Sequence, residues 1–321
     1  MVGFGVAFLI ALSWSLLAPS IGARLGIVDE PDDPSLKVHR TAAVPLGGVG
    51  VFAAVVAGTW IVGGLDPGAT LAAGVLLVAG LLDDIKGLPP WLRLAVEVAA
   101  GVLLAALAAI PESFTSPLGA VAVVAVVVLA VNAVNLLDGI DGLAAASGAI
   151  SALGIAALAL SRGLSGSFGI ILGAALLGFL AVNWPPARVF LGDNGAYVVG
   201  LYLAFGILRV SPAAGWQLLL SLGVLGVFAL DLVITVLRRL LGRAPLFSGD
   251  RAHLYDQAVG RGFSVSGVVL IAAWLQIGFV LTVVVLDQSH SRFLQAGTLL
   301  AIGAGLIVAL ALGGYLRPTG R

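Results

Sequence analysis

The chain has 321 residues, of which 60% are hydrophobic and only 10% are charged, and its 16 Lys and Arg residues balance 16 Asp and Glu residues. Soluble domains are about a quarter charged, so this composition, with a mean hydropathy of +1.14, excludes an ordinary soluble protein and indicates an integral membrane protein. The chain has no cysteine, which excludes disulfides, thiolate metal sites and cysteine nucleophiles.

Apolar runs follow one another along the chain and predict a single all-α, polytopic membrane domain over residues 1–321. A helix that crosses a bilayer needs about 20 apolar residues, and two of the runs are clearly shorter than this. We therefore expect ten or eleven spanning helices. The runs cover residues 3–21, 46–64, 69–82, 91–110, 117–133, 143–160, 167–182, 195–208, 216–237, 266–286 and 294–316.

Basic residues are distributed unevenly between the two sides of the predicted bundle. Counted over alternate connections, all but three of the 16 Lys and Arg residues fall on one side, and the exceptions are Arg162, Arg209 and Arg292. Because Lys and Arg accumulate in cytoplasmic connections, the richer side is predicted to be cytoplasmic and the amino terminus to lie outside. The polar motifs of the chain all fall at helix ends or loops on the cytoplasmic side.

The first two motifs flank the second and third runs. KVHRTAAVPLGGVG, residues 37–50, places basic residues before a Gly pair that opens a helix, where backbone N–H groups favour phosphate. A basic loop that only follows the charge asymmetry explains this motif equally well. In GLLDDIKGLPP, residues 80–90, Asp83 and Asp84 end a run with Lys86 nearby. Acids near a helix C-terminus oppose the helix dipole, so a functional role is favoured over a solvated helix end.

The third motif, NAVNLLDGIDGLAAA at residues 132–146, places two amides and two carboxylates in an apolar chain, where burying them is costly. On a helix, Asn132, Asn135 and Asp138 are three residues apart and would line one face. With Asp141 they form an oxygen-rich group that suits a hard cation. Polar contacts between helices explain one Asn but not four such groups.

The fourth motif is NWPPARVFLGDNGAY, residues 183–197. Asp193 sits in a Gly-flanked turn just before a run, so it approaches a ligand from near a helix N-terminus. Phe190 is either a platform for base stacking or an aromatic residue of the membrane interface, and the second role is the commoner one.

The fifth motif lies in residues 238–264, the longest and most basic of the predicted cytoplasmic loops. Asp250, Arg251, His253 and Asp256 fall within seven residues. A charged loop stabilised by its own ion pairs is one explanation. The arginines also suit bidentate contacts with phosphate.

Taken together, the motifs resemble those of the polyprenyl-phosphate N-acetylhexosamine-1-phosphate transferases, a family that includes MraY and WecA, and they are closer to the WecA- and TagO-like branch. The resemblance extends from about residue 37 to residue 264. The two C-terminal runs, within residues 266–316, contain no residues to which we assign a chemical role. The matching motifs are K-x-H…P-x-GG (37–48), LLDD (81–84), N-x-x-N-x-x-DG-x-DGLA (132–144), N-x-x-PA-x-x-F-x-GD-x-G (183–195) and DR-x-H (250–253).

This resemblance implies an enzyme that transfers a sugar-1-phosphate, by default N-acetylhexosamine-1-phosphate, from a UDP-sugar to undecaprenyl or another polyprenyl phosphate. The products would be UMP and a lipid-linked diphosphate sugar, which would initiate a cell-envelope glycan at the cytoplasmic face of the cell membrane. Phosphate-bearing reactants repel one another, so a divalent cation is needed, and the oxygen ligands suit Mg²⁺, with Mn²⁺ as an alternative. A homodimer is implied by family analogy only, and no nucleic acid partner is expected.

The resemblance also assigns roles to individual residues. Asp193 would be the principal metal ligand, with Asn135 or Asp138 close to the metal. Asp83 and Asp84 would position or deprotonate the lipid phosphate, although a phosphate monoester with its second pKa near ~6 needs little base catalysis. The implied catalytic residues are Asp83, Asp84, Asp138, Asp193 and His253, the metal ligands are Asp193 and Asn135, and the substrate-binding residues are Lys37, His39, Asp141, Asn183, Phe190 and Arg251.

The sequence departs from the family pattern in two places. Relatives usually carry further histidines just after the position of His253, where this chain has Tyr255 and Asp256. An arginine common before the first Gly pair is Leu46 here. The first change alters the loop expected to hold the sugar or diphosphate, which disfavours UDP-MurNAc-pentapeptide as the donor and leaves the sugar open.

Two other functions stay open. A secondary transporter or flippase would relay protons through carboxylates near mid-bilayer, but only Glu97 and Asp231 lie clearly within predicted spans. A catalytically altered homologue that acts as a scaffold would fit the changed segment after His253, although the intact acidic set speaks against it.

Overall fold

The computed structural model describes every residue except 1, 27–43, 214, 244–251, 290 and 317–321, and the structure reported below is that of the described residues. Their only β contact is an isolated bridge between Val44 and Val189, and all their regular elements are helices. In chain order the helices are α1 (Val2–Leu25), α2 (Gly47–Ile61), α3 (Pro67–Lys86), α4 (Pro90–Leu107), η1 (Glu112–Phe114), α5 (Pro117–Leu137), α6 (Leu143–Ser161), α7 (Ser167–Asn183), α8 (Gly192–Val210), α9 (Trp216–Leu222), η2 (Gly223–Leu225), α10 (Gly226–Leu241), α11 (Leu254–Gly260), α12 (Val265–Asp287) and α13 (Arg292–Leu312).

The predicted apolar runs coincide with these helices. Within the described residues, eight helical segments are long and apolar enough to cross a membrane, and one of them is the continuous segment Trp216–Leu241 formed by α9, η2 and α10. The remaining three runs correspond to α2 and α7, which are shorter apolar helices, and to α8. The prediction of an all-α, polytopic membrane protein is therefore confirmed.

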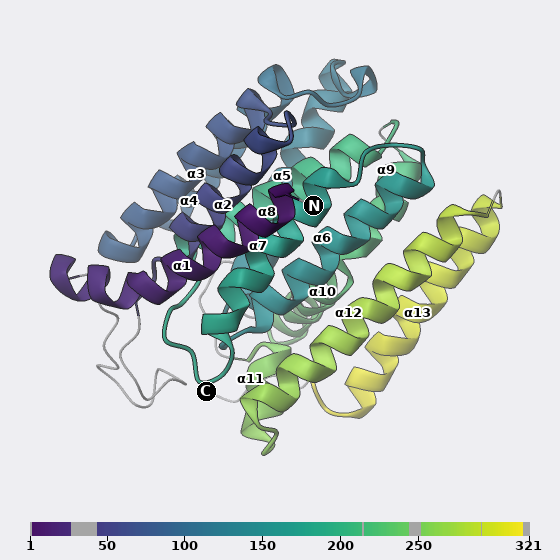
Figure 1. The fold of residues 1–321 in the computed structure, drawn as a ribbon. Helices are drawn as coiled ribbons and strands as arrows, with labels where there is room; N and C mark the ends of the chain where they lie inside the picture. Colours follow the sequence, from purple (N-terminus) through teal and green to yellow (C-terminus); the bar gives the residue numbers. More distant parts are fainter. Residues whose placement is uncertain (1, 27–43, 214, 244–251, 290, 317–321) are drawn as a thin grey trace.

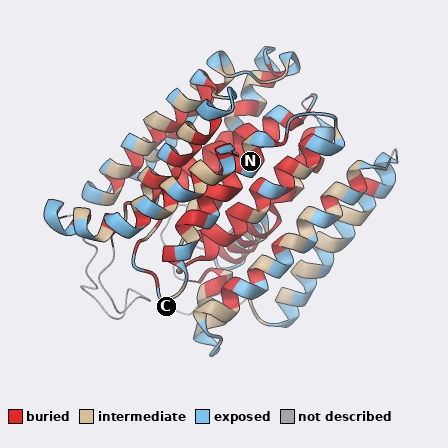
Figure 2. Ribbon diagram, viewed as in Figure 1, coloured by how far each residue is buried: buried red, intermediate tan, exposed pale blue. Residues whose placement is uncertain are grey.

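Helix α8 lies at the centre of the bundle (Figure 1). It packs against α2, α3, α5 and α6, and almost all of its residues from Asn194 to Val210 are buried (Figure 2). Small residues allow the helices to approach closely: a Cβ added at Gly200 would lie only 2.5 Å from the Cα of Val131 on α5. Such close packing holds helices together in lipid, where apolar burial between helices gives little driving force.

The two C-terminal helices lie along one edge of the bundle (Figure 1). Helix α12 packs on α6, whereas α13 packs mainly on α12 and leaves most of its apolar surface exposed (Figure 2). An exposed apolar helix of 21 residues is stable in contact with lipid chains, so this surface agrees with a membrane-spanning position.

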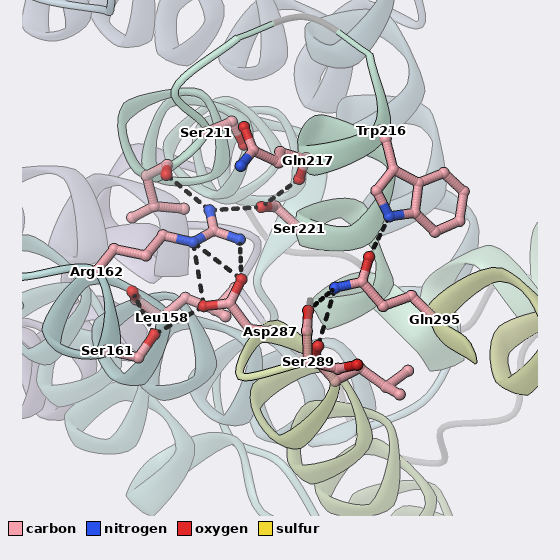
Figure 3. Close-up of polar contacts among 12 residues, drawn as sticks. Leu158, Ser161, Arg162, Ser211, Trp216, Gln217, Ser221, Asp287, Ser289 and Gln295 are labelled. Carbon is pink, nitrogen blue, oxygen red and sulfur yellow. Dashed lines mark hydrogen bonds and ion pairs between the residues drawn. The ribbon is translucent and has the colours of Figure 1, made fainter. Parts of the chain in front are cut away.

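A polar cluster joins several helices at one end of the bundle (Figure 3). Arg162, which follows α6, pairs with Asp287 at the end of α12, with 2.6 Å between Nη2 and Oδ1. Its Nη1 donates to the carbonyl of Val210 at 2.7 Å and to the hydroxyl of Ser221 at 3.0 Å. The cluster thus ties together the ends of α6, α8, α9 and α12, and leaves the opposite ends of α6 and α8 for the site described next.

Candidate functional site

Three helix ends meet at the end of the bundle opposite the Arg162 cluster: the start of α2, the end of α3 and the start of α8. The N–H groups of Gly47 and Gly48 donate to the carbonyls of Phe190 and Leu191 at 3.0 and 3.2 Å, so the chain entering α2 lies beside the chain entering α8. A Cβ at Gly48 would lie 2.3 Å from the backbone of Gly195. The Gly pair therefore allows the close approach of α2 and α8, in addition to opening α2.

Asp84, near the end of α3, caps the start of α8. Its Oδ1 accepts a hydrogen bond from the backbone N–H of Asp193 at 2.8 Å. Its Oδ2 accepts from the backbone N–H and the side-chain amide of Asn194 at 3.1 and 2.6 Å. A carboxylate in this position satisfies the free N–H groups of the first turn and suits the positive end of the helix dipole. The cap fixes the position of Asp193.

Asp83 faces a different direction from its neighbour, because successive helical residues are rotated by about 100°. Its Oδ2 accepts from the hydroxyl of Tyr197 at 2.7 Å and pairs with Nε of Arg93 at 2.8 Å, and its Oδ1 accepts from the backbone N–H of Leu88 at 2.7 Å. The buried carboxylate thereby joins α3 to α4 and α8. Asp84, and not Asp83, is the member of the pair that faces the cavity described below.

The end of α5 supplies the next two polar groups. Asn135 donates from Nδ2 to Oδ1 of Asp193 at 2.5 Å, and the half-buried Asp138 ends the helix. Asn132 instead donates to Glu97 of α4 at 2.5 Å and is not a cavity residue. Three residues further along a helix, a side chain points about 60° away from the first one and lies about 4.5 Å along the axis. Asn132 is six residues before Asp138, so the two side chains lie on different faces of α5.

Two further predicted residues hold the connecting loops together. Asn183 accepts from the N–H of Gly142 at 2.9 Å and donates to the carbonyl of Val189 at 2.8 Å. Asp141 accepts from the N–H of Ala187 at 2.9 Å. These bonds join the turn between α5 and α6 to the loop between α7 and α8.

A cavity of about 290 Å³ lies between these helix ends and loops. Seven of the predicted site residues line it, together with Pro45, Gly139, Ile140, Leu191 and Gly192. The seven are Asp84, Asn135, Asp138, Asp141, Asn183, Phe190 and Asp193. Residues from four separate motifs of the sequence therefore meet in one place.

Negative charge accumulates in this cavity. Burial, together with the charges of Asp193, Asp84 and Asp141, raises the pKa of Asp138 well above its usual range, and a hydrogen bond from the backbone of Gly192 opposes this shift. The crowded carboxylates can be neutralised by a cation.

The oxygen donors of the cavity fit Mg²⁺. Across the described part of the chain, no three Asp, Glu, His or Cys side chains form a ready metal-binding group. Mg²⁺ is usually held by only one or two carboxylates, and its remaining ligands are water and substrate phosphate. Asp193 and Asn135, the predicted ligands, fit such a partial set.

The remaining predicted residues lie outside the cavity or outside the described residues. His253, at the start of α11, approaches Asp231 of α10, with 2.8 Å between Nδ1 and Oδ2. The sequence gives no local signal for this pair, since Asp231 is 22 residues away and reads only as an acid within a span. Lys37, His39 and Arg251 lie outside the described residues.

Comparison with known proteins supports one family. Residues 67–211, which include all seven of the predicted residues that line the cavity, match the model of glycosyl transferase family 4. A probable undecaprenyl-phosphate N-acetylglucosaminyl 1-phosphate transferase of Bacillus subtilis is 29% identical over 307 residues, which cover 90% of this chain and 85% of that protein.

Two other relatives align over similar lengths. The decaprenyl-phosphate N-acetylglucosaminephosphotransferase of Mycobacterium tuberculosis is 28% identical over 335 residues, with 90% of this chain and 81% of that protein covered. The undecaprenyl-phosphate alpha-N-acetylglucosaminyl 1-phosphate transferase of Escherichia coli is 25% identical over 331 residues, with 96% and 88% covered. The matched residues include most of the cavity and the relatives align along most of the chain, so the comparisons support glycosyl transferase family 4 as the family that this chain resembles.

Proposed function

We propose that the protein transfers an N-acetylhexosamine 1-phosphate unit from a UDP-sugar to a polyprenyl phosphate, with N-acetylglucosamine as the first sugar to test. The relatives named above are N-acetylglucosamine-1-phosphate transferases that act on polyprenyl phosphates. One observation carries the proposal for this chain. Asp193 contacts Asn135 in a cavity that Asp84 and Asp138 also line, at the ends of apolar helices.

The reaction needs charge neutralisation more than proton transfer. An oxygen of the lipid phosphate forms a bond to the phosphorus that carries the sugar, and the bond from that phosphorus to the oxygen of UMP breaks. The attacking phosphate is largely dianionic at neutral pH, since its second pKa is near ~6, so no residue has to remove a proton from it. When bound by Asp193 and Asn135, Mg²⁺ would neutralise the negative charge of the diphosphate.

The other cavity residues position the reactants. Asp84 holds the start of α8 and so places Asp193, while Asn183 and Asp141 hold the loops that shape the cavity. Phe190 offers an aromatic face to the uracil ring from the cavity wall. We place this site at the cytoplasmic face of the cell membrane, because one substrate is water-soluble and the predicted cytoplasmic connections hold most of the basic residues.

The test is UMP release by the purified protein in detergent with Mg²⁺, undecaprenyl phosphate and a panel of UDP-sugars. We expect release that requires the lipid, with one preferred sugar, and loss of at least about 100-fold in Asp193→Asn. Glu112→Gln is the matched control, because it makes the same acid-to-amide change at an exposed residue of η1, between the far ends of α4 and α5.

Three results would contradict the proposal. They are the absence of UMP with every donor, release that does not depend on the lipid, and an Asp193→Asn variant as active as Glu112→Gln. The absence of UMP with every donor would favour the alternative that the protein is a transporter or flippase.

A further inference from the structure

The pair formed by Asp231 and His253 has no role in the function proposed so far. Asp231 is 1% exposed and His253 is 5% exposed, so the contact is almost completely buried. The two oxygens of Asp231 act on the start of α11: Oδ2 lies 2.8 Å from Nδ1 of His253, and Oδ1 accepts from the backbone N–H of Leu254 at 2.9 Å. The hydroxyl of Thr235 adds a contact of 3.2 Å to the same Nδ1. One face of the imidazole is therefore fixed by α10.

The second ring nitrogen of His253 is left for a ligand. Both polar contacts of the ring use Nδ1, and Nε2 has no hydrogen bond to any of the described residues. An Asp carboxylate accepts the Nδ1 proton, so the proton or lone pair available for other chemistry is the one on Nε2. A buried carboxylate behind one nitrogen of an imidazole is a common way to orient the other nitrogen.

Tyr255 connects the pair to the cavity. Its ring stacks on that of His253, with 5.3 Å between centroids and 5° between planes. Its hydroxyl donates to the carbonyl of Leu136 at 3.0 Å, two residues before Asp138. Gly139, a cavity residue, leaves room for this hydroxyl, because a Cβ there would lie 1.9 Å from it. The imidazole is thus held against the turn that forms one wall of the cavity.

We propose that Asp231 is a positioning residue that holds His253 through Nδ1 so that Nε2–H donates to a phosphate of the UDP-sugar. The proposal rests on the transferase function proposed above. An imidazole that donates from both nitrogens carries a positive charge. The negative charge of Asp231 would therefore stabilise the positive charge of the His253 ring beside the diphosphate. Hydrogen bonds with a charged donor are roughly twice as strong as neutral ones.

Asp231→Asn tests this role without changing the packing. Its Oδ1 can still accept from Leu254, and its amide can donate to Nδ1 of His253. The ring would then be neutral, with its proton on Nε2. We expect kcat/KM for the UDP-sugar to fall by about tenfold, with the unfolding midpoint close to that of the wild type, because a charged contact becomes a neutral one.

A double-mutant cycle separates positioning from a general structural effect. If Asp231 acts only through His253, Asp231→Asn will cause no further loss in a His253→Gln background. An equal loss in both backgrounds would overturn the proposal.

NMR gives a readout that does not need turnover. The chain has 3 His residues, so the ¹⁵N ring signals of His253 can be identified by their absence in His253→Gln. With uridine diphosphate and Mg²⁺ added, we expect both ring nitrogens of His253 to be protonated in the wild type and Nδ1 to be unprotonated in Asp231→Asn. If the two spectra show the same protonation, the proposal is wrong, even if the wild type is an active transferase.

If the wild type releases no UMP, the proposed reaction fails, and the response of His253 to uridine diphosphate alone decides whether the pair serves a diphosphate site. A variant that does not fold leaves the wild-type titration to decide: a His253 ring that does not respond to uridine diphosphate refutes the role.

Discussion

Replacing Asp84 by Asn should have two effects: it should destabilise the start of α8, and it should inactivate the protein. The wild-type carboxylate accepts three hydrogen bonds, one on Oδ1 from Asp193 and two on Oδ2 from Asn194. An amide has only one acceptor oxygen. In its better orientation the oxygen keeps the two bonds from Asn194, and the new NH₂ group faces the N–H of Asp193.

The size of the effect follows from these contacts. One buried N–H without a partner costs about 1–3 kcal/mol, and two bonds that lose a charged acceptor weaken by about 0.5–1 kcal/mol each. Burial disfavours the charged form of Asp84 despite these hydrogen bonds, so removing its negative charge offsets part of the loss. We therefore expect the free energy of unfolding to fall by about 1–3 kcal/mol. Because the same cap places Asp193, UMP release should fall to the level of Asp193→Asn.

Equilibrium unfolding in detergent micelles with increasing SDS measures the stability change, and the UMP assay measures activity on the same preparations. Glu112→Gln, at an exposed residue, should change neither quantity. A change in the free energy of unfolding below about 1 kcal/mol would show that Asp84 does not cap α8 as the structure has it, because the loss of an N-cap residue alone costs about that much. Normal stability with lost activity would assign Asp84 a direct role in the reaction.

Three further predictions concern the cavity. Asp138→Asn should raise the unfolding midpoint at neutral pH in the presence of EDTA, because the pKa of Asp138 is raised in the folded state and ionisation of this carboxyl therefore favours unfolding. The gain should shrink as the pH is lowered and be lost below the ordinary carboxyl pKa of 3.8, and a gain that is the same at every pH would contradict this reason. Mg²⁺ should raise the unfolding midpoint of the wild type with a dependence on concentration, and Asp193→Asn should lose most of this shift, whereas an equal shift in both proteins would place the cation elsewhere. Gly139→Ala should lower activity and stability by displacing the hydroxyl of Tyr255, with an expected cost of about 1–3 kcal/mol, and Tyr255→Ala should remove most of the added cost in the double variant.

The sequence predicts the helices well because the length and spacing of apolar runs are local properties. Each predicted run corresponds to a helix, and the cavity lies where the motifs at residues 80–90, 132–146 and 183–197 place polar groups at helix ends. Composition and motif spacing are sufficient to predict which ends of the helices carry these groups.

The rotation of each helix about its axis is not predicted in the same way. Asp83 and Asp84 look equivalent in the sequence, but α3 is rotated so that one lies in a cluster with Arg93 and the other caps α8. Asn132 and Asn135 also diverge, one to Glu97 and the other to Asp193. These choices depend on which neighbouring helix supplies a partner, and that information is spread over distant parts of the chain.

The crowding of four carboxylates around one small cavity also bears on how inhibitors of this protein could be designed. A compound that copies the diphosphate of a nucleotide sugar adds negative charge and therefore depends on a cation to bind. A compound that presents ammonium groups toward Asp84, Asp138, Asp141 and Asp193 would take the place of that cation and gain direct ion pairs in a partly desolvated site. Attached to a short apolar chain that enters the bilayer, such an amine would compete with both substrates and with the metal at once.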